Sequence, residues 1–571
     1  MARVPLRRCL LAAAVATAPI ACGDNLPPPD DVAQVGLERV WRSDDAPGCT
    51  IASPLMVESR GDQVLLAALA SGDVIATSPE DGSEVFRLTL PAPPGQVPHI
   101  AATPGLFGSR VVVPYMLRDA DSGDRMDHAM AVIDLEARNF DGDFPVFFLA
   151  ASIPASDESG AVEFLPAHAY SRAAVPVAHP AGSTHGLAYV AFGNLQDIQP
   201  WHGWLFEIDL DAWAAGGEPV SAVFLATPET DCGPDGESGS SDMICGGGIW
   251  SPPGPTLFDR GGGDFELYVA TGNGQLDLGR RDYANSVLRV GRGLTFDPAC
   301  DPDACADFDP IDPAAACIES CRDQFIPRLL PGDPPFDPPD GRCDGKTFFE
   351  CYALLDWDLG ANTPARVAVP GGDDVLAVPA KDGGVYLVDA EHLGTMYDRI
   401  QLTAICGGGG GSTCSANWAG SMVTVPVATQ VDGVPTVVIP TFIFDESNPA
   451  GLVALQIVRG DDGSPRWRKL WQAPSFSSAE AIARFRGHVG RVALVTIAGA
   501  EYAALVDPGD EHTTDGLLYL VRMSDGAIAE RAELDGPGRK YTLPVVRGET
   551  LFVSSCDSED GASHLEAWRP R

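Results

Sequence analysis

Short apolar stretches of about four to eight residues recur along the chain, separated by turns rich in Gly, Asp and Pro. Within them, apolar residues alternate with polar ones, a pattern typical of β-strands. Helical periodicity is nearly absent, and residues 206–215 are the best short candidate for a helix. The strand pattern repeats as a unit, most clearly at 53–89, 362–403, 451–472 and 516–533, and more loosely near 100–150, 173–226, 251–290 and 541–571.

Each unit predicts three or four strands, and this spacing constrains the architecture. Separate four-stranded sheets cannot cover both of their faces, whereas sheets stacked radially cover both and leave only short edges. We therefore predict an all-β fold, an eight-bladed β-propeller with four-stranded blades. Residues 36–42 form an additional strand before the first full unit, and we expect it to pair into the last blade and close the ring. An array of β-sandwiches is the alternative, but it does not explain why the units end in a turn followed by Trp.

The N-terminus has the features of an export signal. Three arginines within the first eight residues precede an apolar run, which predicts a signal peptide over 1–21. The residues before Cys22 resemble a bacterial lipobox, with Pro19 where Leu is usual, so we expect lipidation of Cys22; an ordinary cleaved signal is the alternative. Residues 22–35 would then form a tether and 36–571 the propeller. The predicted location is the periplasm or cell surface, as an outer-membrane lipoprotein held by its lipid anchor alone.

Export also determines how the cysteines are interpreted. Twelve cysteines remain beyond Cys22, and an even number in an oxidising compartment favours disulfides. Cys232 with Cys245, and Cys406 with Cys414, have the spacing of local loop disulfides. Zinc is the rival interpretation of six cysteines crowded into an acidic, Pro-rich insertion at 292–352, but no His lies among them and no CxxC pair occurs. These six are Cys300, Cys305, Cys317, Cys321, Cys343 and Cys351.

Composition narrows the possible functions. The chain of 571 residues carries 79 acidic and 38 basic side chains, a net charge of −41, which argues against nucleic-acid binding because phosphate contacts need a basic surface. Hydrophobic residues make up 45% of the chain, enough to fill large cores. No internal stretch approaches the roughly 18 apolar residues of a membrane helix. We expect a folded, monomeric protein without nucleic-acid partners.

One unit carries a recognisable ending. Residues 383–394, GGVYLVDAEHLG, follow the pattern G-x-V-Y-x-V-D-A…G and lead into an aromatic strand. This ending resembles the repeat of pyrroloquinoline quinone (PQQ) propellers. That superfamily includes eight-bladed quinoprotein alcohol dehydrogenases and non-catalytic relatives, so the resemblance implies a fold and leaves the activity open.

Two short motifs resemble parts of the dehydrogenases' cofactor site. Gly-Gly-Gly-Ile-Trp at 246–250 resembles the Gly-rich turn whose Trp stacks on the quinone, which assigns that role to Trp250. Thr-Gly-Asn at 271–273 resembles the segment whose Asn supplies a calcium ligand, which assigns that role to Asn273. The alternatives are a Trp that packs between blades and an ordinary Asn-Gly turn.

Three further matches follow in the same order. Asp-Trp-Asp at 356–358 resembles the motif that carries the catalytic base, here Asp358, although its carboxylates could instead bond backbone amides in a turn. Lys381 matches a basic residue that contacts the quinone oxygens; a solvated Lys in a hairpin loop is the alternative. Asn417 and Trp418 resemble another quinone-contacting pair.

The chain also departs from the dehydrogenase pattern. It has no two adjacent cysteines, whereas the dehydrogenases form a disulfide between neighbouring cysteines over the quinone. Ile198 stands where they have a calcium-binding Glu, with Asp197 one residue away. Two functions therefore remain: a non-catalytic binding or scaffold module for an envelope protein or polysaccharide, and alternatively a PQQ- and calcium-dependent alcohol dehydrogenase.

Overall fold

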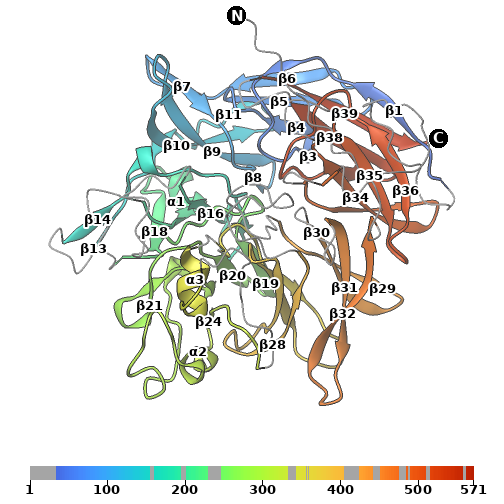
Figure 1. The fold of residues 1–571 in the computed structure, drawn as a ribbon. Coiled ribbons are helices and arrows are strands. Elements are labelled where there is room, and N and C mark those ends of the chain that lie inside the picture. The colour runs from blue at the N-terminus through green and yellow to red at the C-terminus, as the bar shows by residue number, and fades with distance from the viewer. Residues whose placement is uncertain are drawn as a thin grey trace, which may run out of the picture.

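The computed structural model describes most of the chain from residue 34 onward, in thirteen parts. These are residues 34–154, 160–194, 201–228, 246–331, 343–354, 357, 359–403, 424–441, 450–474, 484–485, 489–509, 515–556 and 561–571. Eight antiparallel sheets are arranged around a central axis, as the repeat predicts (Figure 1). No helix among the described residues is long and apolar enough to cross a membrane.

Blades 1 to 4 occupy the first part of the chain. Blade 1 contains β3 (Leu55–Ser59), β4 (Asp62–Ala68), β5 (Asp73–Thr77) and β6 (Glu84–Thr89). Blade 2 contains β7 (Gln96–His99), β8 (Gly105–Phe107), β9 (Arg110–Asp119), β10 (Arg125–Asp134), β11 (Asn139–Phe140) and β12 (Phe147–Phe148). Blade 3 contains β15 (Val177–Ala178), β16 (Leu187–Phe192), β17 (Trp204–Asp209) and β18 (Val220–Leu225), and blade 4 contains β19 (Thr256–Gly261), β20 (Asp264–Ala270), β23 (Val287–Val290) and β24 (Gln324–Phe325).

Blades 5 to 8 complete the ring. Blade 5 contains β25 (Ala365–Val367), β26 (Val375–Pro379), β27 (Gly384–Asp389) and β28 (Met396–Gln401), and blade 6 contains β29 (Val427–Val431), β30 (Val434–Thr441), β31 (Gly451–Arg459) and β32 (Pro465–Ala473). Blade 7 contains β33 (Ala493–Ile497), β34 (Ala500–Asp507), β35 (Leu517–Arg522) and β36 (Ile528–Glu533). Blade 8 contains β37 (Val545–Arg547), β38 (Thr550–Cys556) and β39 (Ala562–Pro570), joined by β1 (Leu37–Arg42) and β2 (Ala46–Pro47) from the other end of the chain.

The remaining elements are short and lie outside the blades. The pair β13 (Ser152–Pro154) and β14 (Ala161–Glu163) projects from the side of the molecule, and β21 (Leu276–Asp277) pairs with β22 (Asp282–Tyr283) (Figure 1). The helices are α1 (Leu210–Ala214), α2 (Ala315–Ser320), α3 (Phe348–Leu354) and the 3₁₀ turns η1 (Pro166–His168), η2 (Leu278–Arg280) and η3 (Arg292–Leu294). The helix predicted over 206–215 begins only at Leu210, where the Asp209 carboxylate caps it by accepting from the Ala212 N–H at 2.9 Å.

Two links between the N-terminal and C-terminal parts of the chain close the ring. As predicted for residues 36–42, β1 pairs antiparallel with β39 and becomes the outermost strand of blade 8. A disulfide between Cys49 and Cys556, 507 residues apart in sequence, joins the segment before blade 1 to β38. The closure is therefore both hydrogen-bonded and covalent.

Buried apolar clusters fill the spaces between neighbouring blades. One cluster joins Val64 and Leu66 of blade 1 to Val111 and Val113 of blade 2, and equivalent clusters occupy the other interfaces between blades. Both faces of each sheet are covered in this way, which is the physical reason that the repeat favours a ring over separate sheets.

The Trp endings of the repeat lie at these interfaces too. Trp471 on β32 of blade 6 packs on Gly526 in the β35–β36 turn of blade 7, and its indole N–H donates to the Met523 carbonyl at 2.8 Å. Trp41 on β1 packs in the same way on Gly82 of blade 1 and donates to the Pro79 carbonyl at 3.0 Å. Each Trp thus fixes one blade against the turn of the next.

The Cys-rich segment contains disulfides, as predicted. They join Cys300 to Cys321, Cys305 to Cys317, and Cys343 to Cys351. Strand β24 falls inside the range 292–352, so this segment supplies the fourth strand of blade 4 as well as the disulfide-bonded loop. The predicted pairs Cys232–Cys245 and Cys406–Cys414 lie outside the described residues, as do Cys22 and the signal peptide.

Candidate functional site on the propeller axis

The segments that lead into the first strand of each blade are joined around the axis by hydrogen bonds. The Ser53 N–H donates to the Thr103 hydroxyl at 2.9 Å, and the Ser251 and Thr363 hydroxyls bond each other at 2.7 Å. Further links in this ring are Leu543 N to Ser53 Oγ, Val175 N to Thr103 O, Ala174 N to Pro252 O, Thr363 N to Thr424 O, and Arg491 N to Thr542 O. Side chains carried by these segments therefore face a common axial region although they come from different blades.

Trp250 reaches this region from the Gly-rich segment 246–250. Gly246 and Gly247 have φ of +72° and +70°, a conformation that favours glycine, and the Gly247 N–H donates to the Asn273 carbonyl at 2.8 Å. A Cβ on Gly193 would lie 2.7 Å from the Trp250 Cβ, so the backbone of the neighbouring segment packs directly against this Trp. The indole is partly exposed and is held firmly at its base.

Lys381 lies against Trp250. Its ammonium nitrogen is 5.1 Å from the centroid of the Trp250 ring, and the residue is 2% exposed, which excludes the alternative of a solvated hairpin lysine. The next residue, Asp382, fixes the turn: its carboxylate accepts from the Gly384 N–H, the Tyr386 hydroxyl and the Arg399 guanidinium at 2.7, 2.7 and 3.0 Å. Burial, followed by the Asp382 charge, raises the pKa of the Tyr386 hydroxyl, which therefore remains a donor.

Asn273 lies close to the same Gly-rich segment. It is 7% exposed and follows β20, and Gly272 N–H donates to the Gly248 carbonyl at 2.9 Å. A Cβ on Gly360 would lie 2.5 Å from that same carbonyl, so three backbone segments meet here. The predicted base Asp358 and the pair Asn417 and Trp418 lie outside the described residues, as do Asp197 and Ile198.

Arg172 is an axial residue that the sequence motifs did not identify. Its guanidinium carbon lies over three aromatic rings, 5.3 Å from the centroid of Tyr170, 5.9 Å from that of Trp250 and 5.5 Å from that of Tyr541. The three rings come from the segments before blades 3, 4 and 8. Because such a cluster forms only when distant blades meet at the axis, no local motif marks it.

A buried arginine holds Tyr541 in place. Arg491 is 8% exposed, and its Nε donates to the Tyr541 carbonyl at 3.1 Å while Nη2 donates to the Ser53 hydroxyl. Burial lowers the pKa of Arg491 to about 10, so the side chain still carries its positive charge near neutral pH. Tyr541 itself has φ of +69°, and the ring at this position also lies 5.7 Å from the Lys540 ammonium.

Two more arginines lie beside Tyr170. Arg118 on β9 and Arg125 on β10 are directly opposite each other in the strand register. Arg118 Nη2 donates to His99 Nε2 at 3.1 Å, and the Tyr170 hydroxyl is 3.5 Å from the same nitrogen. Burial, with a smaller effect from the Arg118 charge, lowers the pKa of His99 to about 3, so its imidazole is neutral and can accept.

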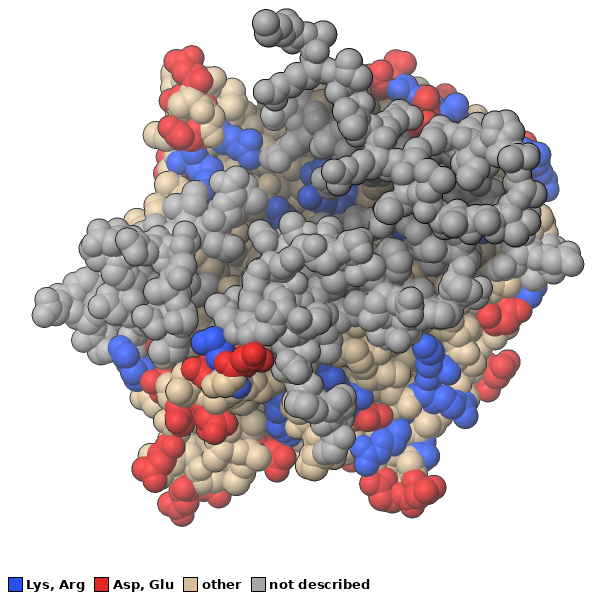
Figure 2. All heavy atoms as spheres, in the orientation of Figure 1, with Lys and Arg blue, Asp and Glu red and all other residues tan. Residues whose placement is uncertain are grey.

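The charge of the molecule is unevenly distributed. Figure 2 shows Asp and Glu side chains gathered at the projecting outer tips, and Lys and Arg side chains also near the middle of this face. The cations that the contacts place around the axis are Arg118, Arg125, Arg172, Lys381, Arg491 and Lys540. These six cations lie around the axis of a chain whose net charge is −41.

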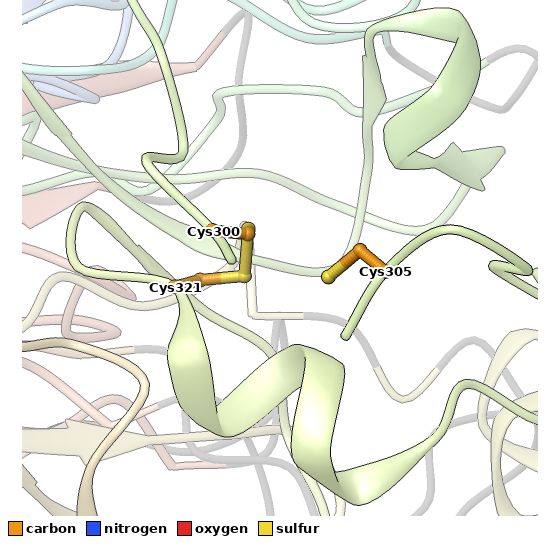
Figure 3. A group of neighbouring side chains, drawn as sticks. All are labelled: Cys300, Cys305 and Cys321. Carbon is orange, nitrogen blue, oxygen red and sulfur yellow. A yellow bond between two sulfur atoms is a disulfide. The ribbon is translucent and has the colours of Figure 1, made fainter. Parts of the chain in front are cut away.

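The described residues supply little of a calcium site. Among them, only Cys300, Cys305 and Cys321 form a group of three potential metal ligands, with ligand atoms within 4.8 Å of one another. Figure 3 shows Cys300 and Cys321 joined in a disulfide with Cys305 beside them, and Cys305 is itself bonded to Cys317. These sulfurs are oxidised, and calcium requires oxygen ligands, of which Asn273 is the one candidate that the described structure places near Trp250.

Structural comparison identifies the fold. No known family's sequence profile matches the chain, and no curated protein sequence matches it. A europium-containing methanol dehydrogenase superposes with a TM-score of 0.53 at 11% identity, covering 93% of each chain. The quinohemoprotein alcohol dehydrogenase ADHIIG from Pseudomonas putida HK5 superposes with a TM-score of 0.51 at 12% identity, covering 94% of this chain and 77% of the dehydrogenase. The chain shares their fold. At these identities the similarity extends to the propeller alone.

Proposed function

We propose that the protein is an exported, lipid-anchored binding module of the cell envelope that holds its ligand on the propeller axis without catalysing a reaction. The observation that carries this proposal is the packing of Arg172 among Tyr170, Trp250 and Tyr541. The partly exposed Trp250, backed by the buried Tyr170 and Tyr541 and by cations from distant blades, forms a surface suited to binding. Trp250, which a quinone would need as a stacking platform, already contacts the chain's own Arg172.

An alternative function is a PQQ- and calcium-dependent alcohol dehydrogenase, favoured by the contact between Lys381 and Trp250. In that case Lys381 and Trp250 would hold the quinone together with Asn417 and Trp418, and Asn273 would contribute one calcium ligand. A bound quinone would supply the oxidising group, and Asp358 would take the alcohol's proton. The described residues offer no carboxylate cluster for the calcium ion, so we rank this function second.

The proposed location rests on the predicted signal peptide, on the predicted lipidation of Cys22 and on the disulfides, which form in oxidising compartments. Residues 22–35 would tether the propeller to the membrane, with contact made by the lipid alone. In a bacterial host, Cys22→Ser should release the full-length protein from the membrane fraction. Membrane retention of that variant would show that another segment anchors the chain.

Titration of PQQ by calorimetry, with and without Ca²⁺, tests the choice between the two functions. A binding module predicts that Ca²⁺ leaves any affinity for this anionic quinone unchanged, because arginine and lysine make the contacts. A dehydrogenase predicts binding that requires Ca²⁺ and that weakens about tenfold or more in Asn273→Ala. Binding that depends on Ca²⁺ in this way would overturn the proposed function.

A further inference from the structure

The paired arginines of blade 2 are an unusual arrangement. Arg118 and Arg125 occupy opposite positions on neighbouring strands, and like charges placed this way destabilise a sheet. Arg125 is partly buried, and its pKa is lowered by burial and by the Arg118 charge. Its Nη1 is enclosed and has no hydrogen-bond acceptor in the described structure. Something other than the sheet itself must favour two arginines here.

Arg172 extends this cationic region toward the axis. Tyr170 lies between it and the blade 2 pair, since the Tyr170 ring is 5.3 Å from the Arg172 guanidinium and the Tyr170 hydroxyl is 3.5 Å from the imidazole that Arg118 contacts. The Arg172 Nε is also enclosed without an acceptor in the described structure. Among the described residues, Arg125 and Arg172 therefore each keep one enclosed N–H donor without an acceptor, and both interact with Tyr170.

Arginines elsewhere in the molecule form ion pairs with carboxylates. In blades 4 and 5, Arg260, Arg289 and Arg366 each bond to carboxylates, among them Glu266 and Glu391. Within the described residues neither Arg125 nor Arg172 forms such an ion pair, although acidic side chains outnumber basic ones two to one in the chain. In the part of the chain that the structure describes, Arg125 and Arg172 thus lack the carboxylates that Arg260, Arg289 and Arg366 have.

We propose that Arg125, Arg172 and Tyr170 form a binding site for an oxyanion, the carboxylate or phosphate group of a ligand that enters along the propeller axis. A guanidinium presents a planar fork of N–H donors that matches the two oxygens of such a group. The oxyanion also neutralises the repulsion between Arg118 and Arg125. This inference rests on the proposed function, because it names the ligand chemistry that the binding module recognises.

Calorimetric titration of the full-length protein in detergent tests the site. The probes are inorganic phosphate, trigalacturonate as a source of sugar carboxylates, and galactotriose as the neutral control. We expect at least one anion to bind, no binding of galactotriose, and an affinity about tenfold or more lower in Arg125→Gln and in Arg172→Gln. Preference for phosphate or for trigalacturonate identifies the source of the oxyanion.

Arg569→Gln is the matched control, because Arg569 lies on β39 beside the outermost strand β1, is exposed, and pairs with Glu38 at 3.2 Å. It should leave the affinity unchanged. Arg125→Lys and Arg172→Lys keep the charge and so protect the fold. They lose the planar fork of N–H donors, so each should also weaken binding.

The proposal is overturned if wild-type protein binds neither anion, or if binding is unaffected by both the Gln and the Lys substitutions. If the wild-type protein binds neither anion and also oxidises no alcohol, the inference alone is overturned. Oxidation of an alcohol by the wild-type protein overturns the binding-module function.

Discussion

His128 is a buried side chain that contributes to the response of this protein to pH. The imidazole is 2% exposed, its Nε2–H donates to the Ala169 carbonyl at 3.1 Å, and its ring packs against Phe192 at 4.9 Å between centroids. Burial lowers its pKa to about 4 in the folded protein. In the unfolded chain the pKa is near 6.5, so the neutral form stabilises the fold fully above that pH, and the stabilisation falls as the pH drops toward 4.

Replacing His128 by Gln removes this titration and keeps an N–H donor for the Ala169 carbonyl. Between pH 8 and pH 5 the wild-type histidine should cost about 2 kcal/mol of unfolding free energy, from proton uptake by the unfolded state alone. Urea unfolding at both pH values should therefore show a smaller loss of stability in His128→Gln than in wild type. Equal losses in the two proteins would mean that His128 is protonated in the folded state.

At the scale of elements, the contact between Trp471 and Gly526 joins blade 6 to blade 7. Gly526 has φ of +75°, and a Cβ there would lie 2.7 Å from the Trp471 ring. An added methyl group would therefore strain the backbone. It would also displace the indole and break its hydrogen bond to the Met523 carbonyl. Gly499, in the β33–β34 turn of the same blade, has φ of +82° with no atom within 4 Å of the added Cβ.

These two glycines give a matched pair of variants. Gly499→Ala should cost about 1 kcal/mol, the penalty for a left-handed backbone. Gly526→Ala should cost about 2–4 kcal/mol, because overpacking at the interface adds to the same backbone penalty. Chemical unfolding measures both, and similar losses in the two variants would show that the Trp471 contact contributes little.

Elements with a clear period-2 pattern could be predicted from the sequence, and those interrupted by proline could not. The unit recognised at 451–472 covers only β31 and β32, whereas blade 6 begins at Val427. Strand β30 contains Pro435 and Pro440, residues that usually argue against a strand within a sheet. By contrast, the alternation in 36–42 and its isolation from the first unit were enough to predict the closing strand.

At the scale of the whole molecule, the axis brings together residues that no local pattern connects. Trp250 and Lys381 were predicted because each lies in a motif, and the structure places them in contact. Arg172 and Tyr541 are 369 positions apart with no motif around either, and only ring closure makes them neighbours. The Cys49–Cys556 disulfide was missed for the same reason, since an even count of cysteines predicts disulfides without their partners.

The charge distribution of the whole molecule favours an anionic ligand in the same region. Figure 2 shows acidic side chains at the projecting tips. The contacts place cations and aromatic rings around the axis. Clefts lined by one sign of charge concentrate ligands of the opposite sign, and the surrounding acidic surface would repel anions elsewhere. Binding should therefore be confined to the axis and should weaken as salt is added.

The central claim is that this axis binds a ligand and does not oxidise one. The most direct measurement is alcohol-dependent reduction of an artificial electron acceptor by the full-length protein, supplied with PQQ and Ca²⁺ and compared with Asp358→Asn. We predict that neither protein shows a rate above that of PQQ and Ca²⁺ alone. A rate that requires the wild-type protein, PQQ and Ca²⁺, and that disappears in Asp358→Asn, would contradict the claim and assign the protein to the dehydrogenases.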